Sequence, residues 1–285
     1  MGLTAESGES TGVGAVTTSS ARKACRRVAA PVMLFLLAGL GATFASAAGI
    51  SDPVLTVYAE SGGNTSVPLV IPYDAACWDA GSHTYSWSLS SPVDLLSGST
   101  FIGSLQAASL LIDAGTSPEI TLTLDVIAGD EWTDFHADTA LLSFPGSIPA
   151  DEAAARLVGS GEVWDLSTPA NEVWMVGLTP HYGSFEACYN GIPPAASTFA
   201  EVLGVVGMPS GGSGHVTGGE SQPGVGYAPL NVPVDDMSLC AAFQLSPNDR
   251  ALTTGVYGFE SSVPEPAALA LLVIGAAIIG RRGRG

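Results

Sequence analysis

The side chains best suited to chemistry lie together in one segment, Gly129-Asp130-Glu131-Trp132-Thr133-Asp134-Phe135-His136-Ala137-Asp138. If residues 133–142 form a strand, alternate side chains share a face, with the acidic and histidine side chains opposite Phe135 and Ala137. Carboxylate oxygens are the usual ligands of Ca²⁺, and an imidazole favours a transition metal. The segment is therefore a candidate metal site, although an exposed polar strand has the same pattern; its ligands would be Asp130, Asp134, His136 and Asp138. No other cofactor is expected.

No catalytic motif accompanies these groups. The one G-x-S-x-G sequence, Gly8-Glu9-Ser10-Thr11-Gly12, lies within the first 47 residues, which are expected to be a leader with a secretory signal peptide. The four histidines are scattered along the chain. A nucleophile motif of this kind needs a strand-turn-helix context, which a leader does not provide. We therefore infer no catalysis, and keep a secreted hydrolase as the alternative.

Aromatic side chains indicate a second kind of chemistry. An exposed ring can stack on a sugar ring, whereas a ring among apolar strand residues belongs to the core. The sequence leaves both interpretations open for a set of seven residues: Tyr85, Trp87, Trp132, Trp164, Trp174, Tyr182 and Tyr189.

Three cysteines lie between residues 48 and 262, the region expected to be exported, namely Cys77, Cys188 and Cys240. An exported protein can form disulfides, and an odd count leaves one thiol free or paired with another molecule. Because Cys188 and Cys240 both lie in strand-like stretches, we expect a disulfide between these two. No C-x-x-C motif occurs, which argues against a redox or zinc motif.

The charge of the chain is strongly one-sided. Residues 48–266 contain 25 of the 27 acidic residues but only two basic residues, Arg156 and Arg250. Nucleic acids and anionic membrane surfaces bind basic patches, so both are excluded as partners of this region. This acidity fits solubility, cation binding or a high-salt habitat, and solubility is the simplest interpretation.

The elements that must position these residues are short strands. Residues 120–127 alternate most clearly, with Ile120, Leu122, Leu124 and Val126 on the face expected to be buried. Turn-forming residues separate the runs, which predicts an all-β fold, specifically a jelly-roll-like β-sandwich. The expected strands cover residues 54–58, 67–71, 83–89, 108–112, 120–127, 135–144, 162–165, 173–177, 184–189, 239–245 and 255–259.

Other segments depart from this pattern. Residues 150–158 and 197–206 are expected to form short helices, and residues 207–227 a long loop rich in Gly, Ser and Pro. Ser246-Pro247-Asn248-Asp249 is expected to form a type I turn. We accordingly divide the exported chain into a sandwich domain, a loop or linker, and terminal strands that complete the sandwich, at 48–206, 207–234 and 235–262.

The first 47 residues have the features of a leader with a secretory signal peptide. Four basic residues in 22–27 precede an apolar stretch over residues 28–44, and the small residues Ala45, Ala47 and Ala48 follow. This order predicts a cleaved signal helix, export by the Sec machinery, and cleavage by signal peptidase after Ala47 or Ala48.

The last 23 residues combine three features in order. The motif Val263, Pro264, Glu265, Pro266 precedes 14 apolar residues, and the basic residues Arg281, Arg282 and Arg284 follow. As a helix the apolar run reaches about 21 Å, short of a hydrocarbon core of roughly 30 Å, which predicts a short transmembrane helix and a transient inner-membrane anchor. The arginines are expected to stay in the cytoplasm.

This tail over residues 263–285 resembles the PEP-CTERM sorting signal of bacteria that make exopolysaccharide. The resemblance implies recognition and removal by exosortase, an integral-membrane transpeptidase. We therefore expect a protein of the cell surface, outer membrane or extracellular matrix, structural or adhesive and associated with exopolysaccharide. A carbohydrate-binding module, or a hydrolase of matrix polysaccharide, is the alternative.

Overall fold

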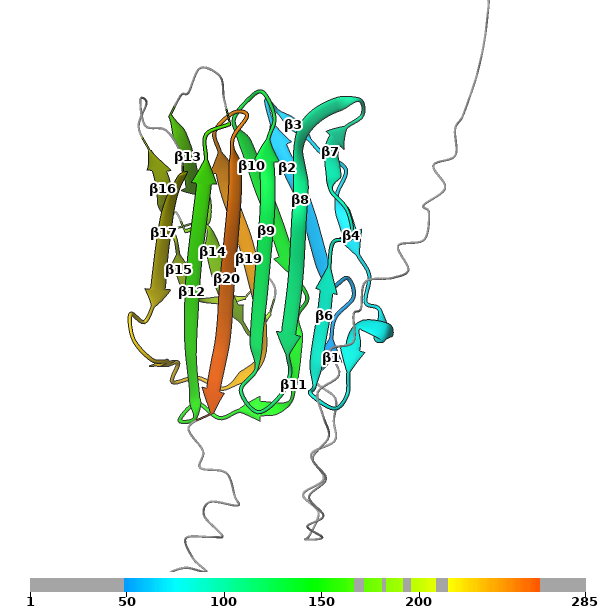
Figure 1. Ribbon diagram of the computed structural model, residues 1–285. Coiled ribbons are helices and arrows are strands. Elements are labelled where there is room, and N and C mark those ends of the chain that lie inside the picture. The colour runs from blue at the N-terminus through cyan, green and yellow to red at the C-terminus, as the bar shows by residue number, and fades with distance from the viewer. Residues whose placement is uncertain (1–48, 167–171, 181–182, 192–195, 209–214, 262–285) are drawn as a thin grey trace, which may run out of the picture.

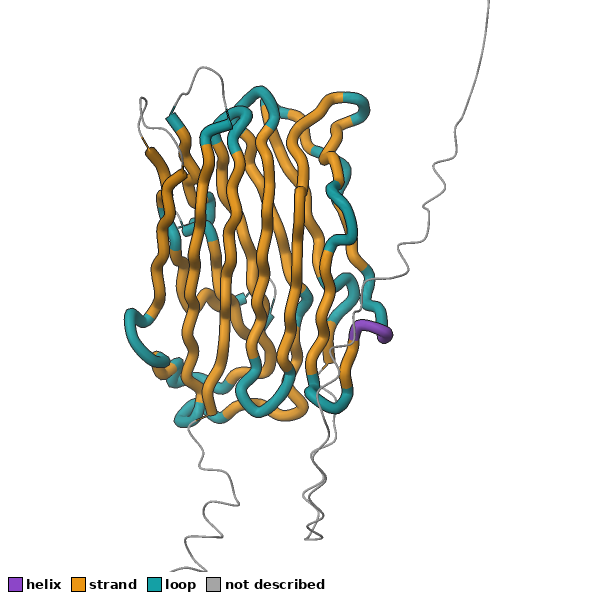
Figure 2. The backbone as a smooth tube through the Cα atoms, in the orientation of Figure 1, coloured by secondary structure: helices purple, strands orange, loops and turns teal. Residues whose placement is uncertain are grey.

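The computed structural model describes residues 49–166, 172–180, 183–191, 196–208 and 215–261. The described chain is nearly all β, as predicted, and its strands form two sheets in a sandwich-like arrangement (Figures 1 and 2). A single turn of 3-10 helix, Ala75–Cys77, is the helical element of these residues. The signal cleavage residues, the sorting motif and both terminal helices lie outside the described residues.

The first sheet has the order β1-β11-β19-β10-β2-β3, with further strands attached to this path. β4 pairs with β2, β13 and β14 pair with β19, β16 pairs with β13, and β15 pairs with β14. Its strands are β1 (Gly49–Ile50), β2 (Leu55–Ser61), β3 (Asn64–Thr65), β4 (Leu69–Ile71), β10 (Thr133–Thr139), β11 (Leu142–Ile148), β13 (Val173–Gly177), β14 (Phe185–Tyr189), β15 (Ser197–Val202), β16 (Val205–Met208) and β19 (Val234–Leu245).

The second sheet has the order β17-β12-β20-β9-β8-β6-β5, with β18 paired to β12 and β7 paired to β8. Its strands are β5 (Trp78–Asp79), β6 (Thr84–Ser88), β7 (Val93–Ser97), β8 (Thr100–Asp113), β9 (Glu119–Ala128), β12 (Ala153–Trp164), β17 (His215–Gln222), β18 (Ala228–Pro229) and β20 (Arg250–Ser261). Pairs of long antiparallel strands such as β12–β20 and β9–β20 form its centre.

The core fills the space between the two sheets. Ile120, Leu122, Leu124 and Val126 of β9 are at most 1 % exposed, which confirms the predicted buried face. From the opposite sheet, the rings of Phe135 on β10 and Phe243 on β19 stack with their centroids 5.7 Å apart. Burying a side chain of this size stabilises the fold by about 1.5–3 kcal/mol, so this layer supplies the main driving force.

Three predicted elements are wrong. The expected helix over residues 150–158 lies largely in β12, whose burial alternates with period two because its 12 residues pair with the 12 of β20. The expected helix over residues 197–206 is instead two strands, β15 and β16. The described part of the expected loop contains β17, which pairs along β12 from Leu157 to Trp164. Strand pairing outweighs the helical preference of alanine and the turn preference of glycine.

The two sheets approach closely where glycines replace side chains on inward-facing positions. Gly255 of β20 faces Phe185 of β14 in the other sheet, and a Cβ at Gly255 would lie 2.4 Å from Phe185 Cδ1. Phe185 is completely buried, so its ring has no room to move aside. Glycine at position 255 thus sets the local spacing between the sheets.

We predict that Gly255→Ala lowers the free energy of unfolding by about 1–3 kcal/mol, because overpacking a filled core forces neighbouring side chains off their preferred rotamers. Urea unfolding followed by circular dichroism measures the change. Gly146→Ala is the matched control, since a Cβ there would meet nothing within 4 Å. Equal midpoints for the two variants would contradict the packing argument.

Candidate functional site

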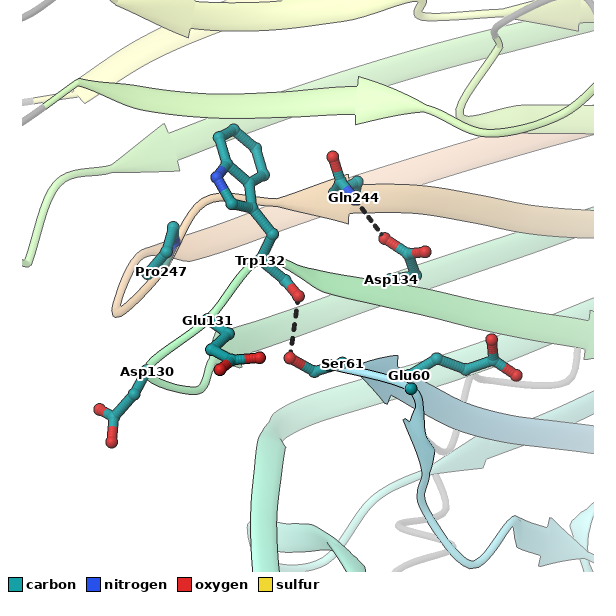
Figure 3. Close-up of a pocket in the computed structure, with 10 residues that line it drawn as sticks. Glu60, Ser61, Asp130, Glu131, Trp132, Asp134, Gln244 and Pro247 are labelled. Atoms are coloured by element: carbon teal, nitrogen blue, oxygen red, sulfur yellow. Dashed lines mark hydrogen bonds between the residues drawn. The ribbon is translucent and has the colours of Figure 1, made fainter.

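A cleft of about 590 Å³ opens at the end of the sandwich where β2 turns into β3, β9 into β10 and β19 into β20 (Figure 3). Four of its side chains are acidic and one is a tryptophan. The cleft is lined by Glu60, Ser61, Gly62, Gly63, Asp130, Glu131, Trp132, Asp134, Gln244 and Pro247.

The β2–β3 turn forms one wall. Gly62 and Gly63 have φ angles of 55° and 79°, the left-handed conformation that a two-residue hairpin turn with the twist of the flanking strands requires. Gly62 also makes room for a neighbour, because a Cβ there would lie 2.4 Å from Glu131 Oε2. The glycine pair therefore fixes both the path of the turn and the position of the Glu131 carboxylate.

Thr133, which is completely buried, anchors the loop that carries Trp132. Thr133 Oγ1 lies 3.1 Å from the carbonyl oxygen of Ile102 and 3.0 Å from that of Glu131. The Gly129 amide also donates to Ile102 O, at 3.0 Å. These bonds tie the loop to β8, so Trp132 projects from a fixed backbone.

The β19–β20 turn forms the third wall. The Asp249 amide lies 3.3 Å from Ser246 O, and Asn248 has a φ of 59°. A positive φ at the third position belongs to a type II turn, so the predicted type I turn is wrong in type. The Asn248 amide donates to Gly129 O at 2.8 Å, which joins this turn to the Trp132 loop.

The floor and walls of the cleft combine an aromatic ring with hydrogen-bonding groups. Ser61 Oγ donates to Trp132 O at 2.9 Å, and Gln244 Nε2 donates to Asp134 Oδ1 at 2.7 Å (Figure 3). The Trp132 side chain is 40 % exposed, and it is the most exposed of the five tryptophans. An exposed indole beside carboxylate and amide groups suits a sugar, which offers apolar C–H faces and hydroxyl groups.

The other aromatic residues of the predicted set lie elsewhere. Tyr85 is in the core, and Trp87, Trp164, Trp174 and Tyr189 are half-buried. Trp164 instead packs against Arg250, whose guanidinium carbon lies 4.9 Å from the ring centroid. Tyr182 lies outside the described residues. Trp132 is therefore the exposed ring on which a sugar-binding interpretation depends.

The predicted metal site is not formed among the described residues, where no three His, Cys, Asp or Glu side chains are close enough to hold an ion. Asp134, His136 and Asp138 do share one face of β10, but alternate residues of a strand stand about 6.6 Å apart. Two of them have other partners: Asp134 accepts from Gln244, and His136 stacks on Tyr58 with centroids 4.7 Å apart. Asp130 and Asp134 line the cleft, whereas His136 and Asp138 do not.

His136 and Asp138 border a second, smaller hollow of about 210 Å³ on the outer face of β10, β19 and β14. Cys240 lies there opposite Glu186, while Cys188 lies opposite Ser238, two residues away in register. The predicted disulfide between Cys188 and Cys240 is absent, and both thiols are free and buried. The register explains the difference, because it places a carboxylate rather than a second thiol across from Cys240.

These thiols are poor nucleophiles. Burial, together with the carboxylate of Glu186, raises the pKa of the Cys188 thiol to about 12. Burial and the nearby Asp138 carboxylate raise the pKa of Cys240 further. Because the thiolate is the reactive form, neither cysteine is activated for covalent catalysis at neutral pH.

Sequence reasoning missed half of the cleft. Glu60, Ser61, Gln244 and Pro247 belong to segments far from Trp132 in the chain. The Gly62-Gly63 pair and the Pro247 turn were recognisable as turns, but their meeting depends on the β2–β10 and β10–β19 pairings.

Comparisons of the chain with protein-family models, with curated proteins and with solved structures found no match. Among the described residues there is also no helix with the length and apolarity needed to cross a membrane.

Asp249 gives the turn beside the cleft a pH-dependent stability. Burial raises the pKa of its carboxyl to about 6 from an ordinary value of 3.8, and Asp165 adds to the shift. Hydrogen bonds from the Ser246 hydroxyl and from the Leu166 amide oppose it. The folded protein therefore holds this proton more tightly than the unfolded chain does.

We predict that this carboxyl lowers the free energy of unfolding by about 2–3 kcal/mol as the pH rises from 4 through 6, and that the loss levels off by about pH 7. Asp249→Asn should remove this component, because an amide does not titrate. Urea unfolding at pH 4, 5, 6 and 7 measures the difference between the two proteins. A difference that stays constant across the series would contradict the assignment.

Proposed function

We propose that this protein is an exported adhesive protein that binds matrix polysaccharide through the cleft around Trp132. It enters the Sec pathway, loses its signal peptide to signal peptidase, and is held briefly in the inner membrane by residues 263–285. An exosortase-type transpeptidase then releases it to the cell surface, the outer membrane or the matrix. The exposed Trp132 indole in an open, hydrogen-bonding cleft is the observation that carries the binding role.

The position of the cleft supports this proposal. β20 begins at Arg250, directly after the cleft turn, and ends at Ser261, where the described chain leaves the sandwich at its opposite end (Figure 1). Its 12 residues span about 36–40 Å at the rise of a β-strand. An anchor that follows Ser261 would therefore hold the cleft away from the membrane.

The architecture supports the proposal as well. The chain passes from one sheet to the other between β9 and β10, between β11 and β12, and between β19 and β20. These crossings support the jelly-roll-like sandwich predicted from the sequence. Such a fold presents its turns at the two ends of rigid strands, which suits the binding of an extended polymer.

We predict that Trp132→Ala weakens binding to the exopolysaccharide of the host by at least about tenfold, because a tryptophan in the centre of a binding surface commonly contributes this much. Affinity electrophoresis through gels containing the purified polysaccharide measures the change. Phe101→Ala is the matched control, since Phe101 is 46 % exposed but does not line the cleft. Equal retardation of the two variants would contradict the proposal, and release of soluble sugar would favour the hydrolase.

We also predict that the mature protein from its host begins at Ala48 or Gly49 and lacks the residues beyond about Pro266. Intact-mass and peptide mass spectrometry of both ends measures this, and any added mass identifies an attached group. A mature protein that retains Arg281, Arg282 and Arg284 would contradict processing by an exosortase. Pro264→Ala with Pro266→Ala should block removal of the tail without changing the N-terminus.

A further inference from the structure

The groups around Trp132 are acidic without a compensating base. Glu60, Asp130, Glu131 and Asp134 line the cleft, and no lysine or arginine lines it. The exported region has only Arg156 and Arg250 as basic residues. Arg250 is already paired, because its Nε and Nη2 donate to the two carboxylate oxygens of Asp125 at 2.8 and 2.6 Å.

The aromatic ring in the same cleft has a matching preference. The face of an indole carries negative electrostatic potential and attracts cations, more strongly than the rings of tyrosine or phenylalanine. Trp132 is exposed, so a ligand can reach this face without rearranging the core. The ring thus adds to the carboxylates a second and chemically different attraction for positive charge.

The hydrogen bonds within the cleft leave the carboxylates available. Gln244 donates to one oxygen of Asp134 and Thr65 to one oxygen of Glu60, so the second oxygen of each carboxylate stays accessible to a ligand. Ser61 bonds the backbone of Trp132 rather than an acidic side chain. Asp130 and Glu131 are both exposed. A ligand with ammonium groups would meet these carboxylates while its sugar rings lie on the indole.

On the basis of the proposed function, we infer that the cleft selects a polysaccharide with free amino groups, namely a partly or fully deacetylated amino-sugar polymer. A uronic acid polymer would be repelled by the same carboxylates. A neutral polymer would use Trp132 and hydrogen bonds from its hydroxyl groups, but it would gain no charge attraction from the carboxylates. Because the carboxylates are exposed, the selectivity is modest and sensitive to salt.

The test compares three defined oligosaccharides by isothermal titration calorimetry with the full-length chain in detergent at pH 6. The probes are a glucosamine hexamer, the corresponding N-acetylglucosamine hexamer and a galacturonic acid hexamer. We expect the glucosamine hexamer to bind about tenfold or more tightly than the N-acetylated one in 20 mM NaCl. This advantage should shrink markedly in 500 mM NaCl, and the galacturonate should not bind.

Variants separate the two contributions. The pair Asp130→Asn with Glu131→Gln should bring the two Kd values within about threefold of each other. Trp132→Ala should weaken the binding of both hexamers, and that of the glucosamine hexamer by the larger factor, because the indole face also attracts ammonium groups. Glu260→Gln removes an exposed charge at the opposite end of β20 and should change neither.

Each contrary outcome has a distinct meaning. Equal or tighter binding of the N-acetylated hexamer would overturn the selectivity for amines and leave the polysaccharide-binding function standing. An equal effect of Glu260→Gln and the paired variant would also overturn it, because the attraction would then belong to the whole acidic surface. If no hexamer binds and the host exopolysaccharide also fails to bind, the proposed function itself is wrong.

Discussion

β19 and β20 are consecutive strands that run in opposite directions, yet each lies at the centre of a different sheet. β19 pairs with β10, β11, β13 and β14, and β20 pairs with β9 and β12. Ser246 to Asp249 make the only covalent connection between these two strands, and the turn spans the gap between the sheets. Both strands carry 12 residues and pair with neighbours on each side, so this one corner joins the centres of the two sheets.

The geometry of the cleft depends on the same β19–β20 turn. The turn presents Pro247 to the cleft and bonds Gly129 through the Asn248 amide, so the Trp132 loop is placed by the β19–β20 connection. Ser246 and the buried Asp249 bond each other inside the turn, and the Ser246 hydroxyl also accepts from the Trp174 amide at 2.8 Å. The loops that line the cleft are therefore bonded to one another as well as to the strands that they connect.

Local patterns in the sequence were informative where one face of a strand is apolar. Ile120 to Val126 alternate cleanly, and the structure buries the predicted residues. The same rule failed for β12, where Ala153 and Ala155 face the core but alanine has little β preference and a high helical one.

The cleft was only half predictable for a related reason. Trp132 and Asp130 stand out in their own segment, whereas Glu60 and Gln244 join them through pairings between strands distant in the chain.

The direction of the strands gives the sandwich two distinct ends. The same strand, β20, begins beside an acidic, aromatic cleft and ends where the chain leaves the sandwich. An anionic membrane surface repels an acidic domain, so a tether at Ser261 would favour orientations with the opposite end outward. In the proposed tethered protein, the long strands of the second sheet would act as a rigid spacer. Its length is set by the number of residues in β12 and β20, and lengthening these strands would move the cleft outward by about 3.3 Å per residue.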